Sequence, residues 1–155
     1  MNLRSPAFMA GFEQTVQSCL LKELAALGLK PSTDEQIKLP KGRAKADLRI
    51  GHVVVEIKTS GLFGMSHVQK YRTYRRQLES AGYRYLFFTA YEGYLPCRRG
   101  LMDAVGRRNV FLLDLPGHWP RFIKTVAEEI QKNSPATRSA RTARHGGLAA
   151  GERGR

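Results

Sequence analysis

Cysteine and long apolar runs are scarce in this chain of 155 residues. The two cysteines, Cys19 and Cys97, share no CxxC or Cys/His spacing, so neither a zinc site nor a disulfide framework is indicated, and we expect free, mostly buried thiols. No stretch approaches the ~18 apolar residues of a membrane span, and MNLRSPAFMAGF lacks the hydrophobic region of a signal peptide. We therefore expect a soluble, cytoplasmic protein.

Acidic residues are also few. Against 13 Asp and Glu stand 26 Lys and Arg, which gives a formal net charge of +13 and a pI of about 10.3. Such a charge favours a polyanionic partner, either nucleic acid or an anionic membrane. The basic segments lack the strong apolar face of a membrane-surface helix, so we expect nucleic acid and no membrane.

The chain has the length of one domain, and its composition changes near residue 134. Residues 134–155 contain five Arg, one Glu and almost no large apolar residue, which predicts a basic, disordered tail. This tail carries a net +4 and leaves +9 for residues 1–133, the predicted folded domain. The basic character therefore belongs to the fold as well.

Apolar spacing and turn residues predict an α/β fold. The order helix, three strands, helix, strand, helix, strand, helix implies a mixed sheet flanked by helices, with a crossover helix after a hairpin near one edge. The expected helices are 11–28, 67–80, 97–106 and 118–132, and the expected strands are 34–41, the two arms of 46–58, 83–90 and 109–115.

The segment 46–58, ADLRIGHVVVEIK, predicts a hairpin with a two-residue turn at Gly51-His52, because Gly accepts the positive φ that the first position of a type II′ turn needs. Counting outward from this turn places Asp47 opposite Glu56. Side-chain alternation then predicts an apolar face (Ala46, Leu48, Ile50, Val53, Val55, Ile57) and a charged face (Lys45, Asp47, Arg49, Glu56, Lys58).

Two directly opposed carboxylates destabilise a strand pair, so something should compensate for them. A hard cation such as Mg²⁺ would do so, and Lys58 on the same face could orient or help deprotonate an attacking water. The alternative is a solvated face with diagonal salt bridges, worth ~0–1 kcal/mol each. In the first helix, Glu13 and Glu23 fall on the apolar side; Glu13 could instead serve the helix dipole, and Glu23 could lie at the rim or pair with a basic residue.

Asp47 followed by Glu56-Ile57-Lys58 resembles the D-x(n)-(D/E)-x-K signature of the PD-(D/E)XK nuclease superfamily, and the element order resembles its restriction-endonuclease-like core, αβββαβ. GFEQTVQSCLLKELAALGL is similar to the opening helix of archaeal-type Holliday-junction resolvases. The resemblance, which covers about residues 11–90, implies a homodimeric endonuclease that uses Mg²⁺, or Mn²⁺ in its place. It implies the catalytic residues Glu13, Asp47, Glu56 and Lys58, and metal ligands Asp47, Glu56, Glu13 and the Ile57 carbonyl.

Basic residues gather in two segments that could contact DNA phosphates. The predicted contacts are Lys41, Arg43 and Lys45 before the hairpin, and Gln69, Lys70, Arg72, Arg75 and Arg76 in the helix after it. Either group could also be an ordinary solvated surface. The sequence thus predicts a Mg²⁺-dependent endonuclease that resolves four-way junctions; the alternatives are a restriction- or repair-type endonuclease on duplex DNA and a non-catalytic nucleic-acid-binding protein.

Overall fold

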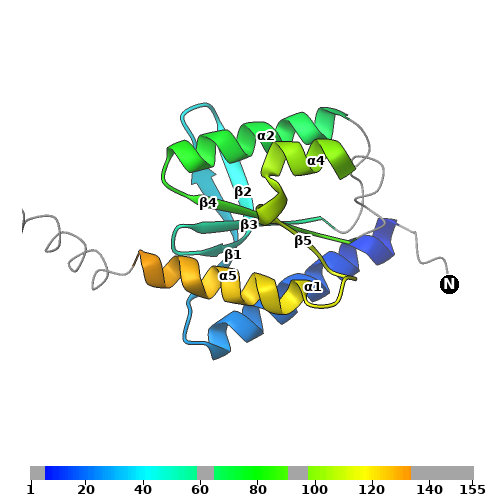
Figure 1. The fold of residues 1–155 in the computed structure, drawn as a ribbon, viewed down its shortest axis with the longest axis vertical. Helices are drawn as coiled ribbons and strands as arrows, with labels where there is room; N and C mark the ends of the chain where they lie inside the picture. The colour runs from blue at the N-terminus through cyan, green and yellow to red at the C-terminus, as the bar shows by residue number, and fades with distance from the viewer. Residues whose placement is uncertain (1–5, 59–64, 91–97, 134–155) are drawn as a thin grey trace, which may run out of the picture.

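The computed structural model describes residues 6–58, 65–90 and 98–133, which form a five-stranded sheet between two layers of helices (Figure 1). This confirms the predicted α/β protein with a mixed sheet flanked by helices. In chain order the elements are α1 (Pro6–Ala26), β1 (Pro31–Lys38), β2 (Arg43–Ile50), β3 (Val53–Lys58), α2 (Met65–Ser80), β4 (Arg84–Thr89), α4 (Arg98–Val105), the short 3-10 helix η2 (Arg107–Asn109), β5 (Val110–Leu112) and α5 (His118–Lys132).

The strands lie in the sheet in the order of the chain, β1-β2-β3-β4-β5. β1, β2 and β3 pair antiparallel, whereas β3, β4 and β5 pair parallel. Parallel neighbours require a crossover, and α2 and α4 provide the two connections. β3 is therefore the central strand, where the antiparallel and parallel halves of the sheet meet.

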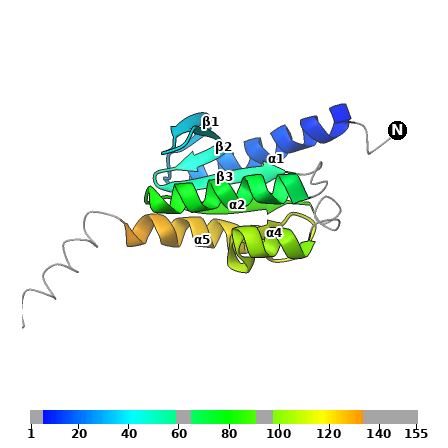
Figure 2. The ribbon, with the colours of Figure 1, turned by 90° about the horizontal axis from the view of Figure 1, so that it is seen from above.

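Each face of the sheet is covered by its own pair of helices, as Figures 1 and 2 show. α2 and α4 cover one face, where Tyr71 and Leu101 pack with the β4 side chain Phe87. α1 and α5 cover the other face, where Leu20 and Phe122 belong to one cluster with the β4 side chain Phe88. None of the described helices is long and apolar enough to cross a membrane.

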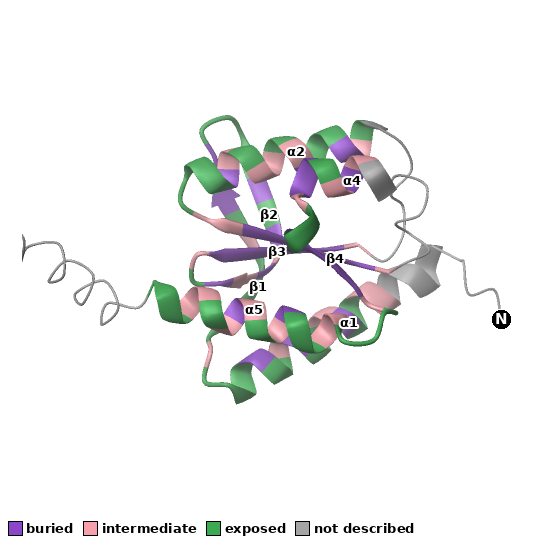
Figure 3. Ribbon diagram, in the orientation of Figure 1, coloured by how far each residue is buried: buried purple, intermediate pink, exposed green. Residues whose placement is uncertain are grey.

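β3 differs from the predicted hairpin arm, because both of its faces are buried (Figure 3). Val54 packs under α2 and Val55 under α1 and α5, so the alternative of a solvated charged face is wrong for this strand as far as Ile57. The physical reason is the parallel partner β4: a central strand with a parallel neighbour is covered by helices on both sides and has a near-continuous apolar run, here VVVEI.

The predicted turn and register are otherwise confirmed where β2 and β3 pair. Gly51 has φ +56°, and Ile50 lies opposite Val53 and Leu48 opposite Val55. The predicted apolar face is wrong at Ala46, which packs on the α2 side, whereas Leu48 packs on the α1 side. The alternation of side chains therefore changes at Asp47, the residue between them.

Three smaller predictions have outcomes of different kinds. β1 begins at Pro31, three residues earlier than expected. Cys19 is exposed, so the expectation of a buried thiol was wrong there, and Cys97 lies outside the described residues. Residues 134–155, the predicted tail, also lie outside them.

Candidate active site

The predicted catalytic residues gather at the end of the β2–β3 pair that lies away from the turn. Asp47 is in β2, Glu56 and Lys58 are in β3, and Glu13 is on α1. The charges of Asp47, Lys58 and Glu13 all influence the pKa of Glu56. The structure therefore brings these four side chains into one electrostatic neighbourhood from three elements that are distant in sequence.

Glu56 is a buried carboxyl group. Its side chain lies on the face covered by α2, and only 7% of the residue is exposed. Burial, followed by repulsion from Asp47, raises the pKa of Glu56 from its usual 4.5 to about 8, while Lys58 and Lys70 partly oppose this rise. The alternative of a fully solvated charged face is thus wrong for Glu56: its carboxylate form is disfavoured unless a proton or a neighbouring cation neutralises it.

Asp47 is half-buried and is held by hydrogen bonds at both its side chain and its main chain. Its Oδ2 accepts the Ile57 N–H at 2.7 Å, and its carbonyl oxygen accepts Gln17 Nε2 at 2.6 Å. Burial raises the pKa of Asp47, whereas the Ile57 N–H bond and the charge of Lys58 act in the opposite direction. The carboxylate is consequently fixed against β3, beside Glu56.

Lys58 and Glu13 form an ion pair with 3.9 Å between Nζ and Oε2. Lys58 is the last residue of β3, and its side chain remains 35% exposed. A lysine placed between buried carboxylates and solvent can contact an incoming phosphate or water. The prediction that Glu13 turns toward the site is in accord with this contact, while Glu23, at the exposed far end of the helix, accepts a hydrogen bond from Trp119 Nε1.

The oxygen atoms at this site fit a hard divalent cation. Asp47 and Glu56 supply carboxylates. The N–H and carbonyl of a strand residue point to the same side, so the Ile57 carbonyl faces β2, as its N–H does, beyond the end of the β2–β3 ladder. Mg²⁺ is commonly held by one or two carboxylates plus waters and phosphate oxygens. Within the described ranges, no three His, Cys, Asp or Glu side chains form a ready-made metal cluster. Glu13, the further predicted ligand, lines the same pocket as Asp47 and Ile57 and is paired with Lys58.

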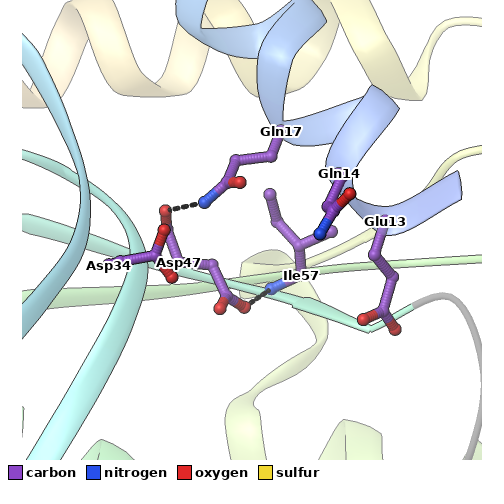
Figure 4. Close-up of a pocket in the computed structure, with 6 residues that line it drawn as sticks. All are labelled: Glu13, Gln14, Gln17, Asp34, Asp47 and Ile57. Atoms are coloured by element: carbon purple, nitrogen blue, oxygen red, sulfur yellow. Dashed lines mark hydrogen bonds between the residues drawn. The ribbon is translucent and has the colours of Figure 1, made fainter. Parts of the chain in front are cut away.

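A pocket beside Asp47 contains residues that the sequence did not reveal (Figure 4). Gln14 and Gln17 enter it from the helix that also carries Glu13, and Asp34 enters from β1. The helical period could have indicated Gln17, since it lies one turn after Glu13. No register was predicted for the strand 34–41, so the position of Asp34 near Asp47 was not predicted.

The predicted DNA-contacting residues separate into three kinds. The first kind, Lys45 and Lys70, lies close enough to Glu56 for attraction between opposite charges. Lys45 also forms an ion pair with Asp34, with 2.6 Å between Nζ and Oδ1. Lys70 Nζ lies 5.4 Å from the ring centres of both Tyr71 and Tyr74. The second kind is exposed to solvent and comprises Lys41, Arg43, Gln69 and Arg76. The third kind, Arg72 and Arg75, makes hydrogen bonds within α2 or to α4.

Comparisons of this chain with protein-family models, with curated proteins and with solved structures found no match.

Proposed function

We propose that this protein is a metal-dependent DNA endonuclease of the PD-(D/E)XK superfamily. The observation that carries the proposal is the buried Glu56 beside Asp47, with Lys58 two residues further along the same strand. Two carboxylates placed together under helices weaken the fold unless a proton or a bound cation neutralises their charge. Their spacing in the chain is that of the D-x(n)-(D/E)-x-K signature.

The arrangement of elements supports a restriction-endonuclease-like core. α1 precedes three antiparallel strands, and α2 then crosses over to a parallel β4, which is the αβββαβ order. The hairpin β2–β3 carries the acidic pair, and α1 supplies Glu13 to the same end of the sheet. This topology is shared by proteins of many functions, so the proposal depends on the site and not on the fold.

Each residue of the site has a role in phosphodiester hydrolysis. Asp47, Glu56 and the Ile57 carbonyl would hold Mg²⁺, or Mn²⁺ in its place, which when bound supplies a Lewis acid for the phosphate oxygens. Lys58 orients the attacking water and stabilises the negative charge that develops on phosphorus oxygens. Glu13 holds Lys58 through their ion pair. The water oxygen bonds to phosphorus as one bridging P–O bond breaks, which leaves a phosphate and a hydroxyl at the nick.

DNA is the polyanion best suited to this chain, with four-way junctions as the proposed substrate and a homodimer as the proposed assembly. The net charge of +13 favours phosphate binding, and Lys45 and Lys70 place two cations from different elements beside the carboxylates. A junction requires paired nicks, which two symmetric sites would provide. Arg76 and Arg43 are exposed and available to extend the contact along the backbone.

The decisive experiment compares cleavage of a labelled four-way junction, a flap and a linear duplex of matched sequence, with Mg²⁺ or with EDTA. We expect Mg²⁺-dependent cutting of the junction by the wild type, and binding without cutting by Asp47→Asn. The control is Asp103→Asn, which makes the same chemical change at an exposed position of α4 and should cut normally.

The other outcomes separate the alternatives. Equal cutting of junction and duplex would favour a restriction- or repair-type endonuclease and exclude the junction preference. Salt-dependent binding with no cutting of any substrate would identify a non-catalytic nucleic-acid-binding protein. Undiminished Mg²⁺-dependent cutting by Asp47→Asn would refute the proposed site itself.

A further inference from the structure

Asp47 lies at an interruption in the sheet. Between β1 and β2, Thr33 lies opposite Leu48 and Glu35 opposite Ala46, but no pair is formed at the intervening position. On the other side, the β2–β3 ladder ends at Leu48 and Val55, one residue before Asp47. Neither neighbouring strand therefore pairs with the residue that carries the first proposed metal ligand.

The interruption has a backbone cause in β1. Asp34, the residue that would face Asp47, has φ +54° and is the one non-glycine residue with positive φ among the residues described. A left-handed conformation costs an L-residue roughly 1–2 kcal/mol, although Asp tolerates it better than most. Because the register is the same on both sides of Asp34, no residue is inserted, and the pairing is interrupted at this one position.

A side chain from α1 replaces the missing strand partner. At this position, where neither β1 nor β3 pairs with Asp47, Gln17 Nε2 donates to the Asp47 carbonyl at 2.6 Å (Figure 4). Leaving this part-buried carbonyl without a donor would cost about 1–3 kcal/mol. Gln17 thus anchors the main chain of Asp47 while the Ile57 N–H anchors its Oδ2.

We propose that Gln17 is a positioning residue that fixes the carboxylate of Asp47. With main chain and Oδ2 both held, Oδ1 remains as the oxygen that meets a cation, and Asp34 makes the arrangement possible by withdrawing from the ladder. The consequence for a metal rests on the proposed function, whereas the positioning of Asp47 does not. Partners that orient a metal ligand typically alter metal affinity or activity 10- to 100-fold when removed.

The test compares Gln17→Met, which keeps the length of the side chain and removes the N–H donor, with Gln14→Met, an exposed neighbour in the same pocket. The first readout is the NMR amide signal of Ile57, which reports its bond to Asp47. The second is a titration of Mg²⁺ alone. We expect Gln17→Met to displace the Ile57 signal and raise the half-saturating Mg²⁺ concentration about 10-fold or more, while Gln14→Met matches the wild type. Amide signals of Val54 and Leu86, within the paired sheet, should stay in place in both variants.

Each outcome bears on the inference. A Gln17→Met variant with wild-type Ile57 signal and Mg²⁺ titration would overturn it, as would a uniform shift of all sheet amides, which would indicate a general packing role. If the wild type shows neither a Mg²⁺ response nor DNA cutting, the proposed function fails, yet a displaced Ile57 signal would still establish the positioning. Should Gln17→Met not fold, Gln17→Asn provides the same test, since its amide is one methylene too short to reach Asp47.

Discussion

The two ends of the β2–β3 hairpin follow opposite rules. At the turn end, Gly51 takes the φ that a tight turn requires, Ile50 and Val53 pair, and the neighbouring Ile130 of α5 packs against the turn. At the open end the ladder stops, β1 contains a left-handed residue, and two carboxyl groups with raised pKa values share the space. At the turn end the β2–β3 ladder is complete, whereas at the open end it has stopped and the β1–β2 ladder is interrupted at Asp47.

This difference separates stability from chemistry along a single pair of strands. Strained backbone and unpaired buried charge persist only where surrounding structure holds them in place, and such features concentrate at functional sites. Here the regular end fixes the register, and the register delivers Asp47 and Glu56 to the irregular end. Substitutions at the two ends should therefore fail in different ways.

The largest effect is expected for Lys58→Ala at the open end. Losing the group that orients water and stabilises the transition state should lower the rate of junction cutting about 10²- to 10⁴-fold in a single-turnover assay. DNA binding in EDTA should stay within about 3-fold of the wild type, since one exposed phosphate contact contributes little. The control is Lys124→Ala on α5, whose side chain is 77% exposed. Normal cutting by Lys58→Ala would remove the lysine from the mechanism.

Glu56→Gln should stabilise the protein in the absence of metal, with an effect that depends on pH. The pKa of Glu56 is about 8 in the folded state against about 4.5 when unfolded, so the folded state binds the extra proton between these values. The favourable contribution of the protonated carboxyl group is complete below pH 4.5 and is lost as the pH rises toward 8. In urea unfolding with EDTA, the free energy of unfolding of Glu56→Gln should exceed that of the wild type by on the order of a few kcal/mol at pH 8.5. At pH 5 the two values should differ little.

Addition of Mg²⁺ should reverse this difference in stability, so that the wild type becomes more stable than Glu56→Gln. Mg²⁺ bound to the folded state alone raises the melting temperature of the wild type, and Glu56→Gln should lose most of that rise. Glu128→Gln, at an exposed position of α5, provides the control and should respond as the wild type does. A variant no more stable than the wild type at pH 8.5 would show that the carboxylate is already compensated within the fold.

Gly51→Ala tests the turn end, where a loss of stability without a loss of chemistry is expected. An alanine at φ +56° is strained by roughly 1–2 kcal/mol, and its Cβ would lie 3.3 Å from Ile130 Cδ1. The melting temperature should fall by about 2–8 °C, while the cutting rate of the folded fraction stays unchanged. Gly82→Ala, which has a similar φ of +86° but no atom within 4 Å of the added Cβ, separates backbone strain from the contact with α5. A slower cutting rate in Gly51→Ala would show that the two ends are coupled.

The regular end of the hairpin was predictable from the sequence and the irregular end only in part. The Gly51-His52 turn and alternate apolar residues specify the register, and this register alone predicts that Asp47 and Glu56 lie close together. The change of face at Ala46 and the break at Asp34 were not predictable, because both depend on a third strand whose pairing is set by tertiary contacts. The burial of Glu56 was missed for a related reason: alternation indicates a strand with one buried face, whereas β3 pairs with the parallel strand β4 and is covered by helices on both faces.

Two neighbouring arginines of α2 allow the same comparison, between a residue that supports the fold and a residue that is free to contact DNA. Arg75 is engaged in the fold, since its Nε lies 3.0 Å from Glu79 Oε1 and its Nη1 donates to the Ala104 carbonyl at 3.5 Å, whereas Arg76 is exposed. Arg76→Ala should lower affinity for DNA a few-fold and reduce the slope of log K against log salt by about one, because one phosphate contact is lost. The melting temperature of Arg76→Ala should not change.

Arg75→Ala should lower the melting temperature by loosening α2 from α4 and leave the salt slope nearer to that of the wild type. Fluorescence anisotropy with a labelled junction at four salt concentrations measures both slopes, and an unchanged slope for Arg76→Ala would place this part of α2 outside the DNA interface.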